Sequence, residues 1–195
     1  TEVYDNYFYD FVGEIEVISN KSCHNKYYNN TFRDYSGTLT LRHGNDCEVF
    51  DNFFIANSKF FSGGVRVMGE NHKIYNNYIE GVNAKKPDGS TSNAVGGINV
   101  SNGRVSSALN GYMAVKNVTI TNNTFVNCDF GLRIGTNVAG DLTIAPDNLI
   151  VANNAILSNS STAKAIEQIT SPTGTSSKYD GNIKQSGTWN ITTGT

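Results

Sequence analysis

Residues 3–8 read Val-Tyr-Asp-Asn-Tyr-Phe, and the same spacing of an apolar residue, an asparagine and a second apolar residue returns along the chain. The central asparagines of these segments are Asn6, Asn30, Asn52, Asn77, Asn123 and Asn154. Successive intervals are 24, 22, 25, 46 and 31 residues, so most lie in the low to middle twenties. A period of this length indicates a solenoid, in which each repeat packs only against its neighbours.

The segments between these asparagines indicate strands. They alternate apolar and polar residues over short distances, and none carries the apolar stripe of an amphipathic helix. Leucine-rich repeats share the period, but they need regularly placed leucines, and this chain has few. We therefore predict an all-β fold, a right-handed parallel β-helix with a partial set of coils.

A second set of alternating strands follows the asparagine corners. Because strand side chains alternate between the two faces of a sheet, one set should point inward and the other outward. The predicted inward set is Ile15, Leu39, Val65, Ile98, Leu132 and Ile166. The predicted outward set is Glu16, Thr40, Arg66, Asn99, Arg133 and Glu167. One face of this sheet should carry charge, whereas the corner asparagines should form structural ladders and adopt the left-handed conformation of tight corners.

Composition indicates one domain over residues 1–195. A chain with 38% hydrophobic residues can bury one core, and no run approaches the roughly 18 apolar residues of a membrane span. The formal net charge of -2 excludes a strongly basic nucleic-acid binder, although it is compatible with a local basic groove. We therefore expect neither nucleic acid nor a membrane as a partner.

Further predictions concern the two ends of the chain and its cysteines. Thr1 stands in the middle of a coil, so we predict a fragment that lacks N-terminal coils, with Thr1 at an exposed edge that pairs with another polypeptide. Residues 158–195 are predicted to form an irregular C-terminal coil and tail, because residues 158–177 are rich in serine, threonine and glycine. Cys23 and Cys47, one coil apart, are predicted to form a buried thiol pair rather than a disulfide.

Glu14 and Glu16 are the first candidates for chemistry. On one predicted strand, both carboxylates would project from the same face, about 7 Å apart at the backbone. A shared hard cation would relieve their repulsion, and calcium suits oxygen ligands in irregular geometry, although it takes roughly six to eight of them. A further ligand would have to come from the coil before Thr1. The alternative is a solvated glutamate pair on an exposed strand.

Basic residues follow on the same and neighbouring coils. Lys21 ends one predicted strand and Arg42 ends the next, and nearby positive charge would favour the neutral amine that a general base needs. Arg66, one coil further, could hold a substrate carboxylate bidentately. His43 and His72 are candidate proton carriers or substrate contacts, although a lone histidine is more often a hydrogen-bonded structural residue.

Several of these segments together resemble a known family. Residues 14–22 read Glu-Ile-Glu-Val-Ile-Ser-Asn-Lys-Ser, and residues 41–44, one coil later, read Leu-Arg-His-Gly. Gly-Gly-Val-Arg at residues 63–66 and His-Lys-Ile-Tyr-Asn-Asn-Tyr at residues 72–78 extend the pattern. On these segments, residues 13–81 resemble polysaccharide lyase family 6, the parallel β-helix alginate lyases and chondroitinase B.

The resemblance implies β-elimination at a 4-linked uronic acid. A base removes the C5 proton, the oxygen at C4 departs, and an unsaturated uronate remains. The implied roles are calcium ligands at Glu14 and Glu16, the base at Lys21, a second catalytic group at Arg42, and substrate contacts at Arg66 and His43. Since a guanidinium almost never gives up its proton, Arg42 is expected to stabilise charge and deliver a proton from water, with His43 as the alternative donor.

The resemblance also implies partners and a location. The implied substrate is an anionic polysaccharide, alginate ahead of chondroitin or dermatan sulfate, and the missing N-terminal half of the enzyme is an implied partner. A secreted or periplasmic location is expected, although no signal peptide is visible. Two other classes stay open: a non-catalytic β-helix such as an adhesin, phage-tail domain or carbohydrate-binding module, and a β-helix glycoside hydrolase. The hydrolase would use Glu14 and Glu16 as acid and base, although same-strand neighbours flank a glycosidic bond poorly.

Overall fold

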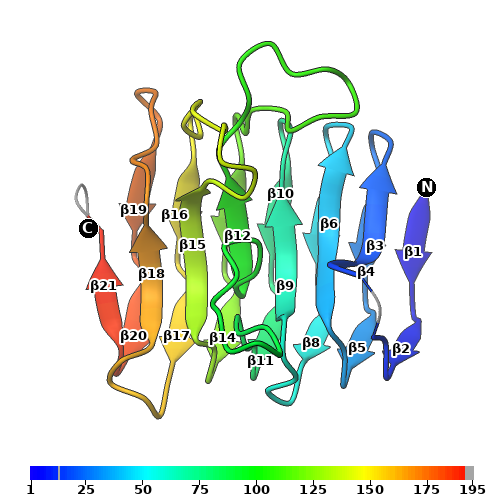
Figure 1. The fold of residues 1–195 in the computed structure, drawn as a ribbon, viewed down its shortest axis with the longest axis vertical. Helices are drawn as coiled ribbons and strands as arrows, with labels where there is room; N and C mark the ends of the chain where they lie inside the picture. Colours follow the sequence, from blue (N-terminus) through cyan, green and yellow to red (C-terminus); the bar gives the residue numbers. More distant parts are fainter. Residues whose placement is uncertain (13, 192–195) are drawn as a thin grey trace.

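The computed structural model describes residues 1–12 and 14–191, whose regular structure consists of 21 short strands. These strands form three seven-stranded sheets, here called A, B and C, in which neighbouring strands run parallel. Each coil of the chain adds one strand to every sheet, and the coils stack side by side (Figure 1). No helix that could cross a membrane is found in the described residues. The predicted parallel β-helix is confirmed.

Sheets A and B contain only three-residue strands, whereas strands of sheet C reach seven residues. Sheet A consists of β1 (Glu2–Tyr4), β4 (Lys26–Tyr28), β7 (Glu48–Phe50), β10 (Lys73–Tyr75), β13 (Thr119–Thr121), β16 (Ile150–Ala152) and β19 (Lys178–Asp180). Sheet B consists of β2 (Tyr7–Tyr9), β5 (Thr31–Arg33), β8 (Phe53–Ile55), β11 (Tyr78–Glu80), β14 (Thr124–Val126), β17 (Ala155–Leu157) and β20 (Ile183–Gln185). Sheet C consists of β3 (Glu16–Lys21), β6 (Gly37–His43), β9 (Ser62–Val67), β12 (Ile98–Ser101), β15 (Phe130–Thr136), β18 (Lys164–Gln168) and β21 (Thr188–Asn190).

The corner between sheets A and B is built from a ladder of asparagines. Each side-chain amide donates to the side-chain oxygen of the asparagine in the next coil at 2.9–3.0 Å, as from Asn52 to Asn77 and from Asn77 to Asn123. The ladder includes the six predicted asparagines and a seventh, Asn182. The left-handed conformation falls on the residue before each ladder asparagine, as at Asp51 and Asn76, and not on the ladder asparagine itself.

The core lies inside the coils, where inward side chains of the same position stack on one another. In sheet B, the rings of Phe8, Phe32 and Phe54 stack with centroids 4.6 and 4.7 Å apart. In sheet C, the inward column runs through Leu39, Val65, Ile98, Leu132 and Ile166, as predicted. All five of these aliphatic side chains are buried, so each adds about 1.5–3 kcal/mol of hydrophobic stabilisation.

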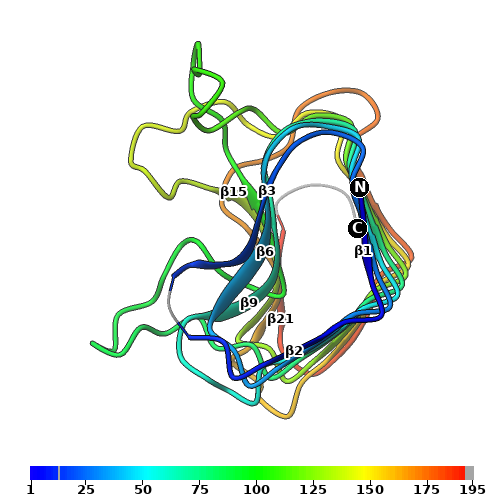
Figure 2. The same cartoon turned by 90° about the vertical axis from the view of Figure 1, so that its right-hand side faces the viewer.

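Two insertions interrupt the regular repeat. The long interval between Asn77 and Asn123 holds two loops, residues 81–97 before β12 and residues 102–118 after it. These loops, together with residues 137–149, stand on the outer side of sheet C (Figure 2). These three loops, here called the wall loops, border a groove whose base is the outer face of sheet C.

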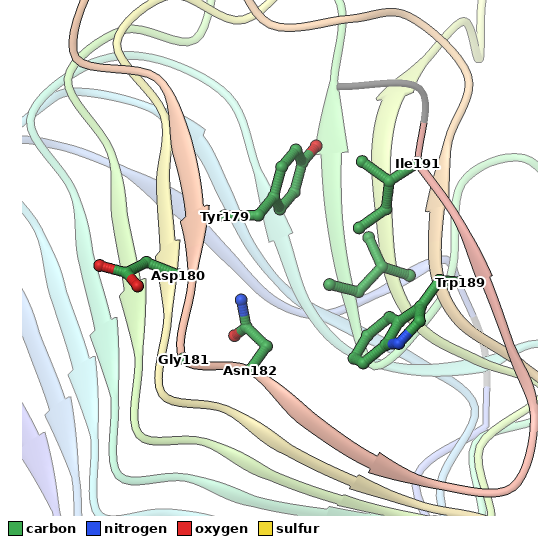
Figure 3. A pocket seen from close by; sticks show the side chains of 7 residues that line it. Tyr179, Asp180, Gly181, Asn182, Trp189 and Ile191 are labelled. Carbon is green, nitrogen blue, oxygen red and sulfur yellow. The ribbon is translucent and has the colours of Figure 1, made fainter. Parts of the chain in front are cut away.

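The C-terminal region is more regular than expected. Residues 158–195 were predicted to be irregular, yet they include β18, which closes the sixth described coil, and β19, β20 and β21, which form the seventh. The final tail, residues 192–195, lies outside the described residues. Ile166, Tyr179, Trp189 and Ile191 surround an apolar hollow of about 80 Å³ at this end of the core (Figure 3). Because its lining continues the core, this hollow marks the end of the stack of inward side chains.

Candidate active site

The outer face of sheet C collects the charged residues that the sequence suggested. Strand register aligns Thr40 with Arg66, Arg66 with Asn99, Asn99 with Arg133, and Arg133 with Glu167. The predicted first member is wrong: Glu16 pairs with Thr38, and Ser19 occupies the position beside Thr40. A register shift between Glu16 and Ile18 causes this displacement, and it puts Ile18, not Ile15, in the inward column.

Glu14 and Glu16 nevertheless reach the same pocket. β3 begins at Glu16, and Glu14 lies in the bend before it, so the prediction that both stand on one strand is wrong. Both residues line a pocket of about 300 Å³ on the outer face of sheet C, together with Arg42 and Arg66. Two carboxylates and two guanidinium groups therefore share one small, solvent-open space.

Arg66 lies deep in this pocket, with only 2% of its side chain exposed. Its Nη1 atom is 3.8 Å from Glu16 Oε1, a distance at the outer limit of an ion pair. Burial lowers the pKa of the Arg66 guanidinium, and the charge of Glu16 partly opposes that change. Its Nε is buried and has no hydrogen-bond partner among the described residues.

Arg42 lines the same pocket and lies against the ring of Tyr112. The Cζ atom of Arg42 is 4.3 Å from the centroid of that ring, within the range of a cation–π contact. Its Nη1 also approaches the sulfur of Met68 at 3.5 Å. No carboxylate forms an ion pair with Arg42 in the described part of the chain, so its charge is available to a ligand in the groove.

Lys21 stands at the end of β3, next to Arg42 on the neighbouring strand. It is exposed and pairs in register with His43, because a register shift leaves Arg42 between two pairing positions. Adjacent strands lie about 4.8 Å apart, so Lys21 and Arg42 leave the backbone within roughly one strand spacing. Lys21 does not line the pocket itself, but it lies on the strand next to that of Arg42, which does.

A buried network fixes the end of β3. The amide of Asn20 donates to the carbonyl of His43 at 2.9 Å, and its side-chain oxygen accepts from the hydroxyl of Tyr27 at 2.8 Å. Asn20 is buried beneath the strand, whereas Lys21 beside it is exposed. The network therefore ties the backbone that carries Lys21 to the strand that carries Arg42.

The two candidate histidines differ in their hydrogen bonding. His43 follows Arg42, but its Nε2 is buried and has no partner among the described residues. His72 is fully buried: the N–H of Cys47 donates to its Nδ1 at 3.1 Å, so its Nε2 carries the proton and donates to the Met68 carbonyl at 2.9 Å. Burial lowers the pKa of His72. Because His72 is buried and both ring nitrogens form hydrogen bonds within the chain, the predicted substrate contact by His72 is wrong.

The predicted buried thiol pair is also wrong. Cys47 is buried, but Cys23 is exposed, and its sulfur accepts from the backbone N–H of Asn45 at 3.3 Å. The cysteines are free thiols. The Cys47 position is structural, because its backbone binds His72 and its sulfur lies 3.6 Å from the Asn20 amide.

Comparison with known proteins identifies the family. A family model described as chondroitinase B matches residues 1–186. The chain belongs to the chondroitinase B family. No match to a curated protein was found.

Solved structures give the same relationship. The chain is 32% identical to the family 6 alginate lyase AlyGC, with a TM-score of 0.79 over 95% of this chain and 26% of that one. A family 6 alginate lyase in complex with a trisaccharide is 25% identical, with a TM-score of 0.74 over 94% of this chain and 42% of that one. A mannuronic acid specific family 6 lyase from human gut microbiota is 26% identical, with a TM-score of 0.63 over 93% and 36%. The chain thus spans a quarter to under half of these relatives.

Family membership raises the question of calcium, and the residues present fit it in part. Glu14 and Glu16 supply oxygen ligands of the kind that calcium takes, in a single pocket. No group of three or more His, Cys, Asp or Glu side chains that could hold a metal occurs in residues 1–12 and 14–191. The pair can therefore hold one side of a calcium ion, and a full shell needs further oxygen atoms.

Sequence reasoning missed the residues that build the walls. Tyr112 comes from the loop of residues 102–118, which returns over strands two and three coils away. Arg104 in the same loop forms a bidentate ion pair with Asp141, at 2.7 and 3.0 Å. The only sequence signal was the long interval before Asn123, which revealed extra chain without its direction.

Proposed function

We propose that this chain carries part of a polysaccharide lyase site that cleaves a 4-linked uronic-acid polymer by β-elimination, with alginate as the favoured substrate. The observation that carries the proposal is the pocket that Glu14, Glu16, Arg42 and Arg66 line together, with Lys21 on the strand next to that of Arg42. The alginate lyases among the structural relatives support the choice of substrate.

The basic residues suit binding of a polyanion. Arg42 has no carboxylate partner among the described residues, and Arg66 approaches Glu16 only at 3.8 Å, so both guanidinium groups can donate hydrogen bonds to a uronate carboxylate. Buried guanidinium groups bind carboxylates through short, charge-assisted hydrogen bonds. Calcium, held in part by Glu14 and Glu16 when bound, would supply further neutralisation of the uronate carboxylate.

Lys21 is the proposed base. The C5–H bond of a uronate is weakly acidic, and removal of its proton places negative charge on the adjacent carboxylate group. Lys21 would take that proton through its neutral amine, while Arg42 and Arg66 stabilise the negative charge that develops. The pair of electrons from the C5–H bond then forms the C4–C5 double bond, and the C4–O4 bond breaks.

A second candidate substrate is a sulfated uronate polymer. The match to the chondroitinase B family model favours dermatan or chondroitin sulfate. The 32% identity to an alginate lyase favours alginate. Both substrates would undergo the same β-elimination at the same residues, so the alternatives differ only in what the groove accepts.

The test follows the double bond directly. The protein, expressed with its native flanking sequence, would be incubated with calcium and separately with polymannuronate, polyguluronate and dermatan sulfate, while ultraviolet absorbance and reducing ends are measured. Rising absorbance on either alginate block supports the proposal, and a rise on dermatan sulfate alone selects the second candidate. Reducing ends without absorbance would indicate a hydrolase, and binding without either signal would indicate a carbohydrate-binding module.

A further inference from the structure

Tyr112 is the aromatic residue of the pocket, and three arginines surround it. The centroid of its ring lies 4.3 Å from the Cζ of Arg42, 5.8 Å from that of Arg66 and 5.5 Å from that of Arg104. Tyr112 also lines the pocket that contains Glu14 and Glu16. One phenol group therefore lies at the point where the positive charge of the groove is concentrated.

The wall of the groove holds Tyr112 in this place. The backbone N–H of Arg104 donates to the Tyr112 carbonyl at 2.9 Å, and the Arg104 side chain is anchored by Asp141. Gly103 and Ile144 exchange two backbone hydrogen bonds, at 2.8 and 2.9 Å, which join two of the wall loops. Tyr112 is thus tied to its surroundings through both its ring and its backbone.

The surroundings of Tyr112 favour loss of its phenol proton. Burial by itself raises the pKa of Tyr112, but hydrogen bonding from Arg42 and the charge and hydrogen bonding of Arg66 outweigh it and lower the pKa below its ordinary value. A phenol oxygen has two acceptor sites and one donor. Arg42 and Arg66, which lie against the ring, can donate to this oxygen and leave its own O–H for an acceptor in the pocket.

The reaction needs such a donor. The leaving O4 oxygen must gain a proton, and neither neighbour supplies it well: the guanidinium of Arg42 holds its protons, and Nε2 of His43 is buried. We propose that Tyr112 is the catalytic acid, which donates its phenol proton to O4 as the C4–O4 bond breaks. The assignment rests on the proposed lyase function.

The proposed step balances. Lys21 takes the C5 proton, the C5–H electron pair forms the C4–C5 double bond, and the C4–O4 electron pair passes to O4. Tyr112 gives its proton to O4 and becomes a phenolate, which the charges of Arg42 and Arg66 stabilise. A proton from water then restores Tyr112, and Lys21 returns its proton to solvent. Arg42 acts on O4 through Tyr112.

The test separates proton donation from packing. Tyr112→Phe keeps the ring over the arginines and removes only the hydroxyl group. Turnover would be measured on an oligouronate and on an analogue that carries fluorine at C4, because fluoride leaves as an anion without a proton. The variant should eliminate the glycosidic oxygen about 10²–10⁴-fold more slowly, and it should eliminate fluoride at close to the wild-type rate.

Two results would overturn the assignment. Wild-type turnover of the oligouronate by Tyr112→Phe would remove the hydroxyl group from the mechanism, and equal losses on both substrates would show a packing role. Tyr28→Phe, which removes a hydroxyl group from sheet A, is the matched control and should leave both rates unchanged. A wild-type protein that forms no double bond on any uronate would refute the lyase function itself, and the Tyr112 role with it.

Discussion

The asparagine ladder and the outer face of sheet C are built from the same coils but follow opposite rules. Along the ladder, one residue type returns in every coil, and Asn30, Asn52, Asn77, Asn123 and Asn154 are buried. Along the outer face of sheet C, threonine, arginine, asparagine, arginine and glutamate follow one another. Repetition therefore marks the positions that maintain the fold, and its loss marks the positions available for chemistry.

Strand spacing explains the difference. An amide has both donors and an acceptor, so identical asparagines can bond one another at the spacing of about 4.8 Å between coils. Identical charges at that spacing would repel, so a charged column must vary. Among the described strand pairs, the register shifts, such as those between β3 and β6 and between β12 and β15, all lie in sheet C. The regular sheets thus hold the irregular one in place.

The largest expected effect on stability is at the centre of the ladder. Asn77→Ala removes the hydrogen bonds that its amide donates to Val49, Tyr75 and Asn123, and it removes the acceptor of the buried Asn52 N–H. The free energy of unfolding should fall by about 4 kcal/mol in chemical denaturation. The matched change Asn6→Ala, at the exposed end of the ladder, should cost about 1 kcal/mol. Equal costs at both sites would contradict a cooperative buried ladder.

A smaller effect is expected at Gly44, which ends the strand of Arg42. Its φ is +87°, and an added Cβ would lie 2.3 Å from the backbone carbon of Ser22, the residue after Lys21. Gly44→Ala should therefore cost about 3 kcal/mol and shift the backbone beside Lys21, lowering turnover as well. Gly89→Ala, with a φ of +82° and open space around it, isolates the conformational strain and should cost about 1 kcal/mol.

The smallest effect concerns the pH dependence contributed by His72. Because burial lowers its pKa below 6.5, the unfolded chain binds this proton more readily than the folded chain. The stability that neutral His72 contributes is present above pH 6.5 and is lost as the pH falls from there toward the folded-state pKa. His72→Gln should flatten that part of a stability–pH curve measured by denaturation.

The sequence predicted the features that repeat and failed where the chain departs from its repeat. The ladder asparagines and most of the inward column, from Leu39 to Ile166, could be predicted because the same residue pattern recurs in every coil. Glu16 was placed in the wrong column because a register shift in β3 has no signal in the alternation of residues. His72 resembled a site residue in type, but its burial depends on the fold of neighbouring coils.

The place of Tyr112 in the pocket could not be predicted from the sequence. Its partners Arg42 and Arg66 precede it by 70 and 46 residues in the printed sequence, and only the return of the wall loop brings them together. A solenoid period describes contacts between successive coils. Contacts that a long loop makes across several coils are set by the packing of that loop, for which the period carries no information.

The most direct test of the account is a paired measurement on Lys21→Ala. Lys21 is exposed and outside the ladder, so the melting temperature should stay close to that of the wild type, while formation of the C4–C5 double bond on alginate should fall by about 10²–10⁴-fold. Lys73→Ala, an exposed lysine in sheet A, is the control and should retain full activity. Undiminished double-bond formation by a folded Lys21→Ala protein would contradict the assignment of chemistry to the outer face of sheet C.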